Sequence, residues 1–208
     1  MADAATSRVN IVNRALTKLG EPASYSIDDQ SNLGGIVDAV WAGVEARVTA
    51  TFDWSFCRKT VQLSQISSPP NNGWTYGFAL PGDRVGEPMA VLQQAGVSEQ
   101  YLRDFMIEQG NIYTNNTPIW ARIRVLLDPQ YWDLGFAEAF ALALAAGLAL
   151  PLLQDGNIAT EFEKMAFGSA QEQGSGGLFG KLIALNRAAQ PQGRNFMAND
   201  PLTRARFM

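Results

Sequence analysis

The stretch "TFDWSFCRKTVQLS", residues 51–64, marks the point at which the hydrophobic pattern of the chain changes its period. Before it, apolar residues return every three or four positions, which is typical of an α-helix with one buried face. After it, Val61 and Leu63 alternate with polar neighbours, and this pattern favours a β-strand. Three aromatic residues, Phe52, Trp54 and Phe56, lie at the change itself. We therefore expect them to pack at a junction between a helix and a sheet.

Two helices are predicted upstream of this junction. The segment "TSRVNIVNRALTKLGEP", residues 6–22, begins with capping residues and ends with a glycine and a proline that stop a helix. The second helix is expected from about Gln30 to Phe52, after the segment "SIDDQS". We interpret Asp28 and Asp29 in that segment as helix caps rather than metal ligands, because negative charge is favourable at a helix N-terminus.

Strand signals and then helix signals follow the junction. Alternating patterns and turn residues run from Cys57 to Leu127 and predict a small sheet of four to six strands. Helix signals return at Asp128, with an apolar helix that Pro151 ends and a further helix at 157–173. The predicted fold class is therefore α+β. It comprises a bundle of about four helices from residues 1–56 and 128–173, an inserted β-rich module at 57–127, and an extended, flexible C-terminal tail at 174–208.

The apolar run from Leu134 to Leu153 has about the length of a membrane span. Glu138 lies inside it, glycine and alanine are frequent, Pro151 lies near its end, and no basic cluster flanks it. These features favour a helix buried among protein neighbours. We therefore expect no membrane association, with a membrane-associated protein as an alternative that detergent-free solubility would test.

The composition excludes several kinds of chemistry. The chain of 208 residues contains no histidine and a single cysteine, Cys57. Catalysis that depends on histidine, histidine-ligated metals and intrachain disulfides are therefore excluded. Glycine-rich nucleotide-binding motifs are absent from the sequence. Arg58 and Lys59 beside Cys57 would suit a reactive thiol, but a structural role for the cysteine is the preferred interpretation.

Acidic pairs are a remaining source of catalysis. Asp128 with Asp133, or Glu161 with Glu163, would provide the two carboxylates that a glycosidase needs. Acidic residues at helix starts and on exposed faces more often serve capping and solvation. We therefore predict a protein that is not an enzyme and has no catalytic, cofactor-binding or metal-binding residues, with a small carboxylate-dependent hydrolase as the alternative.

The C-terminal part differs in charge and composition from the rest. Residues 173–208 hold five basic residues against one acidic residue, whereas the whole chain has a net charge of −4. The "GSGG" run at 174–177 predicts a flexible joint, and the segment after it has too little apolar content to fold alone. We expect an arm that docks on a partner, with a solvated terminus as the alternative. The residues predicted to make the docking contacts are Leu178, Phe179, Leu182, Ile183, Arg187, Arg194, Arg204, Arg206 and Phe207.

Several motifs follow one another in a recognisable order. They are "ALTKLGEP" at 15–22, "SIDDQS" at 26–31, "EARVTATFDWSFCRKTVQL" at 45–63, "GWTYGFALPGD" at 73–83 and "DPQYWDLGFAEAFALALAAGLALPL" at 128–152. In this order and spacing, they resemble the phage head-to-tail adaptor family that includes tail tubular protein A. The resemblance spans about residues 9–152 and does not extend to the tail, because members of this family tend to continue the last helix.

The resemblance implies a structural protein of the virion, placed at the head–tail interface as a ring of roughly twelve copies. The implied partners are other copies of the chain, the portal protein, a downstream tail or nozzle protein, and DNA that passes through the lumen without sequence-specific binding. The predominantly acidic body agrees with this, because a basic channel would retain DNA. The N-terminal segment lacks a signal-peptide pattern, so we expect synthesis and assembly in the bacterial host cytoplasm. A stopper or a tail terminator is the alternative ring component.

Overall fold

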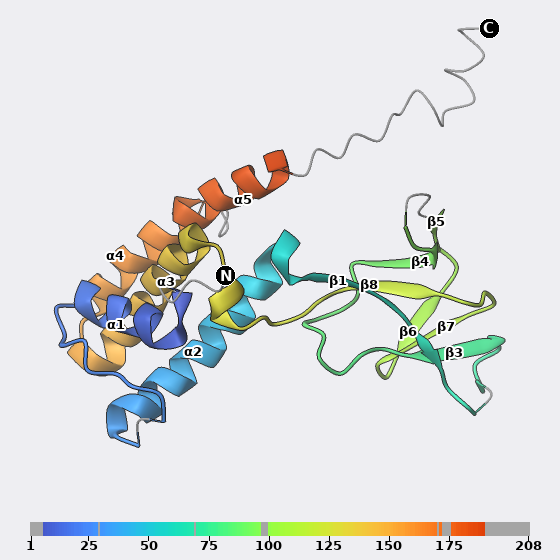
Figure 1. Cartoon of the computed structure of the whole chain (residues 1–208), viewed down its shortest axis with the longest axis horizontal. Helices are drawn as coiled ribbons and strands as arrows, with labels where there is room; N and C mark the ends of the chain where they lie inside the picture. The colour runs from blue at the N-terminus through green and yellow to red at the C-terminus, as the bar shows by residue number, and fades with distance from the viewer. Residues whose placement is uncertain are drawn as a thin grey trace, which may run out of the picture.

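The computed structural model describes residues 6–28, 30–68, 70–96, 100–169, 171 and 176–189. Within these residues it contains five α-helices and two antiparallel four-stranded sheets. The α+β prediction is therefore confirmed at this level. Figure 1 shows the helices gathered at one end of the molecule and the strands at the other. We call residues 6–57 together with 128–189 the helical part, and residues 58–127 the sheet part.

The helices begin where polar side chains accept hydrogen bonds from the first free backbone N–H groups. Ser7 and Ser31 cap the first two helices, and Asp133 and Asp155 cap the third and fourth. The cap of the second helix is thus Ser31 rather than Asp28, which lies in a turn with a positive φ of 63°; Asp29 lies outside the described residues. The helices are α1 (Arg8–Lys18), α2 (Asn32–Thr51), α3 (Leu134–Leu153), α4 (Gly156–Phe167) and α5 (Gly177–Ala189).

Helix α3 is the centre of the helical part, and the other four helices surround it. It is long and apolar enough to cross a membrane, but 67% of its most apolar window is buried inside the protein. Gly147 lets α2 approach closely, because a Cβ atom there would lie 2.6 Å from Val40 Cγ1. Pro151 lies within the helix, which continues to Leu153, so the expectation that this proline ends α3 is wrong.

The described residues of the sheet part contain eight short strands rather than the expected four to six. Several of them pair over only two or three residues, a length at which the alternation of apolar and polar residues gives little signal. One sheet has the order β1-β8-β4-β5, formed by Arg58–Gln62, Trp120–Arg124, Ala90–Gln94 and Gln100–Tyr101. The other has the order β2-β3-β7-β6, formed by Ser64–Gln65, Tyr76–Ala79, Asn111–Thr114 and Met106–Glu108.

Each part has its own hydrophobic core. The core of the sheet part includes Phe78, Ile112 and Ile123, whereas the aromatic residues around α3 belong to the core of the helical part. The two cores are connected by β1 and β8, which run side by side in antiparallel register with Arg58 opposite Arg124. Both crossings of the chain between the two parts therefore lie together, as Figure 1 shows.

Candidate functional site at the helix–sheet junction

Trp54 is the centre of the junction and is 3% exposed. It follows α2 and precedes a short 3₁₀ helix, η2 (Ser55–Cys57), which leads directly into β1. Its indole Nε1 donates a hydrogen bond to the backbone oxygen of Val48, 3.0 Å away in the last turns of α2. The ring meets Phe52 and Phe136 edge-on, with centroids 5.1 and 5.0 Å away. Trp54 therefore fixes the direction in which the chain leaves α2.

An aromatic layer continues from Trp54 into the helical part. Phe136 on α3 contacts Phe56, Trp132 and Phe179. Trp132 in turn stacks on Trp41 of α2, with centroids 5.8 Å apart and planes within 11°. The predicted residues Phe52, Trp54 and Phe56 thus do come together, but they pack on α3 and α5 rather than on the core of the sheet part. The layer orients the start of β1 from the helical side.

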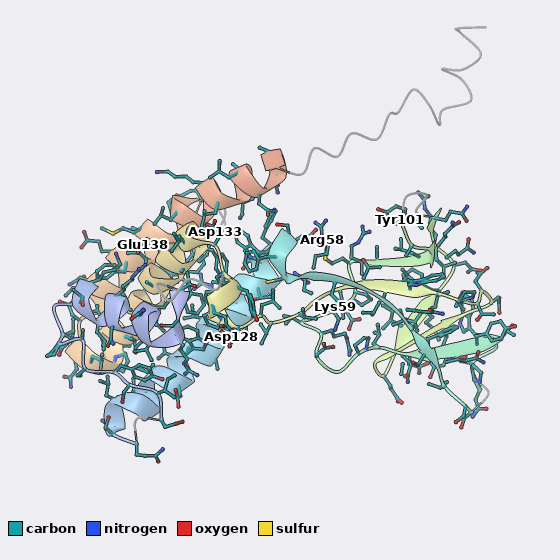
Figure 2. All side chains as sticks on the ribbon, viewed as in Figure 1. Arg58, Lys59, Tyr101, Asp128, Asp133 and Glu138 are labelled. Carbon is teal, nitrogen blue, oxygen red and sulfur yellow. The ribbon has the colours of Figure 1, made fainter. Side chains whose placement is uncertain are left out.

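Polar contacts from the strands complete the junction. Arg124, the last residue of β8, donates from Nη1 to the backbone oxygen of Ala50, 2.8 Å away at the end of α2. Arg58 at the start of β1 forms two hydrogen bonds with the carboxylate of Asp53. Figure 2 labels Arg58 at the narrow connection between the two parts. A guanidinium at a helix C-terminus is favourable because the last carbonyl groups there lack partners.

Burial raises the pKa of two ionisable groups near the junction, Cys57 and Glu45. Burial, and then the negative charge of Glu45, raises the pKa of the Cys57 thiol to about 12. The pKa of Glu45 is also raised, by burial, against the lowering effects of a hydrogen bond with Trp41 and the charge of Arg8. Since the thiolate is the reactive form of cysteine, Cys57 is held in an unreactive state and serves packing.

Three of the four carboxylates that the sequence offered as acid pairs have structural partners. Asp128 accepts a hydrogen bond from the Gln130 N–H, and Asp133 caps α3. Glu163 forms a 2.6 Å ion pair with Arg47. Figure 2 labels Asp128 and Asp133 near the start of α3. In the part of the chain that the structure describes, no group of three Cys, Asp or Glu side chains is arranged to hold a metal ion.

A pocket of about 460 Å³ opens beside the aromatic layer. We call it the junction pocket. Its floor is aromatic, while two side chains at its rim, Tyr131 and Leu185, are 64% and 66% exposed. Its lining residues are Trp54, Ser55, Phe56, Tyr131, Trp132, Asp133, Phe136, Leu182, Leu185 and Asn186.

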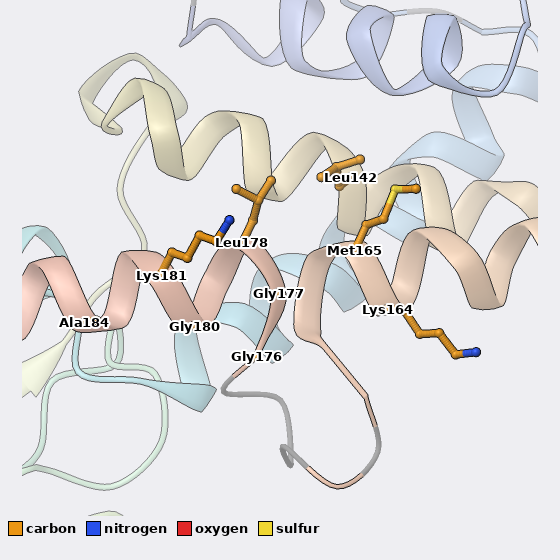
Figure 3. Close-up of a pocket in the computed structure, with 9 residues that line it drawn as sticks. All are labelled: Leu142, Lys164, Met165, Gly176, Gly177, Leu178, Gly180, Lys181 and Ala184. Carbon is orange, nitrogen blue, oxygen red and sulfur yellow. The ribbon is translucent and has the colours of Figure 1, made fainter.

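A second hollow, of about 710 Å³, lies where α5 packs beside α3 and α4. Figure 3 shows Leu142 and Met165 facing each other across it, with Leu178 nearby. Lys164 extends away from the hollow in the same view. Lys181, by contrast, extends beside Leu178, so the hollow combines a small apolar surface with one nearby ammonium group.

The first part of the predicted flexible arm is a helix, α5, that packs on the helical part. Phe179 and Ile183 are 2% and 6% exposed and belong to the core of the helical part, and Phe179 stacks on Phe167 of α4 at 5.0 Å. Leu178 and Leu182 are half-buried against the same core. The prediction of a flexible arm starting at 174 is therefore wrong for residues 177–189.

Gly177, the last residue of the glycine-rich run, begins α5. Its φ is 58°, and a Cβ atom there would lie 2.6 Å from the backbone oxygen of Met165. This glycine thus permits a tight entry into α5. At the other end of the helix, the Arg187 guanidinium lies 5.3 Å from the ring centroid of Phe52. The remaining predicted docking residues, Arg194, Arg204, Arg206 and Phe207, lie outside the described residues.

Sequence reasoning missed three contributors to the junction: Arg124, Phe136 and Phe179. A signal existed for Phe136, because Phe136 and Phe140 are four residues apart and so share one helix face, and Trp132 precedes them by the same interval. Comparisons with known proteins add no further information: no protein-family model matches the chain, and no curated protein matches it.

Proposed function

We propose that this chain is a structural protein of a bacteriophage particle, a head-to-tail adaptor that forms a ring between the portal and the tail. DNA passes through the lumen of the ring, and the chain performs no chemistry. The observation that carries the proposal is the junction, where an aromatic layer and two arginine contacts hold the start of β1 and the end of β8 against the helical part. The ordered motifs that resemble the adaptor family support the same function.

A ring subunit needs a fixed angle between its parts because angular errors accumulate around the ring. In a closed ring of roughly twelve copies, a deviation of about 2° per subunit would add up to about 24°. A junction built from large, rigid aromatic rings limits such deviation at low entropic cost. In this proposal α1 to α4 form the bundle of the subunit, and the sheet part is the module inserted into it.

The distribution of acidic and basic residues supports a channel that does not retain DNA. Residues 1–56 and 128–173 hold five basic against fourteen acidic residues, whereas residues 57–127 hold six basic against five acidic residues. An acidic surface toward the lumen would let DNA pass, because few cations would be present to replace its counterions. The proposed partners are further copies of this chain, the portal protein and a downstream tail or nozzle protein. The proposed location is the head–tail interface of the virion, after assembly in the bacterial cytoplasm.

Native mass spectrometry of the purified protein, alone and mixed with the portal protein encoded by the same genome, tests this function. The expected result is a closed assembly of one fixed number of 22.6 kDa subunits, at least when the portal is present. Electron microscopy of that assembly should show a central channel. A chain that stays monomeric with the portal present would refute the proposal. Labelled copies found at the distal end of the tail tube would identify a tail terminator instead.

A further inference from the structure

The junction pocket has a rim of exposed apolar side chains. Tyr131 and Leu185 are 64% and 66% exposed, and they are two of the eight large hydrophobic side chains that the described structure leaves most exposed. Both side chains line the pocket. Exposed apolar side chains that gather around an aromatic hollow mark a binding site.

We propose that the junction pocket binds the side chain of Phe196, delivered by the chain's own C-terminal segment, residues 190–208. The first argument is position. The described helix α5 ends at Ala189, and its residues Leu182, Leu185 and Asn186 line the pocket. The segment that follows α5 therefore starts about one helical turn from the site that it would fill.

The second argument is the length of the connection. Phe196 is seven residues beyond Ala189, the last residue of α5. Seven residues span at most about 24 Å. The distance back along α5 from Ala189 to Leu182 is about 10 Å, because the helix rises about 1.5 Å per residue. Phe196 is thus within reach of the pocket.

The third argument is chemical complementarity. A pocket of about 460 Å³ accommodates a phenyl ring together with part of a neighbouring side chain such as Met197. Asp133, an acidic residue at the wall, accepts hydrogen bonds from two N–H groups of α3. Arg194 lies two residues before Phe196, and the segment 190–208 carries three arginines against one aspartate. A basic aromatic segment therefore suits an aromatic pocket with an acidic wall.

The chain's own segment is favoured over that of a second copy. A short connection keeps Phe196 near the pocket at an effective concentration of about 1 mM or more. This exceeds the concentration of other copies in a dilute solution. The inference does not depend on the proposed ring function, because it concerns the isolated subunit.

A disulfide trap in the full chain tests the inference. Leu185→Cys places a thiol at the exposed rim, and Met197→Cys places one next to the proposed anchor while leaving Phe196 in place. Cys57 is buried and does not compete. Under mild oxidation, we expect an intrachain disulfide that runs as a monomer on a non-reducing gel. Adding Phe196→Ala should slow its formation at least fivefold, whereas the matched control Phe207→Ala should change it less than twofold.

Acrylamide quenching of tryptophan fluorescence gives a second readout without added cysteines. Trp54 and Trp132 line the pocket, so Phe196→Ala should increase quenching relative to both the wild type and Phe207→Ala. Circular dichroism checks that each variant is folded. Three outcomes would overturn the inference: covalent dimers as the main oxidation product, which would indicate a second copy; a rate of disulfide formation that Phe196→Ala leaves unchanged; or equal quenching of the two alanine variants.

Discussion

Replacing Trp54 by alanine should be the most damaging single change at the junction. The side chain is 3% exposed and contacts aromatic rings from α3 and α5 as well as Phe52. Truncating such a buried ring costs about 3–5 kcal/mol through lost contacts and the cavity left behind. The Val48 carbonyl would also lose the indole donor, a loss of about 1 kcal/mol. For a chain of this size, 3–5 kcal/mol corresponds to a fall in melting temperature of between about 6 and 20 °C.

Two companion variants separate the contributions. Trp54→Phe keeps a ring in the layer but removes the N–H donor, so we expect a smaller loss of about 1–2 kcal/mol. Trp74→Ala is the matched control, because Trp74 is half-buried in the sheet part and belongs to neither core cluster. Thermal melts followed by circular dichroism measure all three. If the melting temperature of Trp54→Ala is no lower than that of Trp74→Ala, the assignment of Trp54 as the centre of the junction is refuted.

The same variants test whether the junction affects formation of the proposed ring. If the aromatic layer sets the angle between the parts, Trp54→Ala should impair formation of the proposed ring at a temperature where the subunit is still folded. Trp54→Phe should assemble nearly as well as the wild type, because a ring still fills the layer. Sizing by native mass at that temperature distinguishes the two. Equal assembly by a folded Trp54→Ala subunit would separate stability from ring geometry and contradict this step.

Two substitutions and one labelling experiment give further predictions. Gly147→Ala should lower stability by about 1–3 kcal/mol in urea unfolding, because its Cβ would meet Val40 at 2.6 Å; unchanged stability would mean that α2 shifts freely. The Cys57 thiol should react with alkylating reagents about a thousandfold more slowly in the native protein at pH 8 than in urea, because its raised pKa leaves little thiolate. Glu45→Gln should stabilise the protein at pH 7 and lose this advantage near pH 4, because the raised pKa of Glu45 means that its ionisation above the unfolded-state pKa opposes folding; an advantage that grows as pH falls would contradict this sign.

The sequence was most informative where the signal is local. The change of hydrophobic period places the end of α2 within a residue of Phe52, and Ser7 and Asp133 cap helices as capping chemistry predicts. These features depend on residues a few positions apart, so a single sequence contains them. The same reasoning identified Trp54 as a junction residue because aromatic side chains cluster where the period changes.

The features that the sequence did not reveal depend on long-range contacts. The pairing of β1 with β8 joins residues about sixty positions apart, and nothing local in Arg124 indicates that it reaches the end of α2. Helix α5 was predicted as part of a flexible arm because a glycine-rich run is the usual composition of a linker. Its burial depends on Phe167 and Phe136, which come from other helices. Composition therefore indicates whether a segment tends to be flexible. It does not indicate whether other helices provide a surface on which the segment packs.

The junction and its pocket are two sides of one aromatic layer. Trp54 and Phe136 contact each other inside the layer and also form the floor of the junction pocket. Helix α5 closes the layer, since the Ser55 hydroxyl donates a 2.7 Å hydrogen bond to the Asn186 side chain. A side chain that enters the pocket would therefore touch the same rings that orient β1. Because packed aromatic rings resist small displacements, filling the pocket would stiffen the angle between the two parts, and emptying it would loosen that angle.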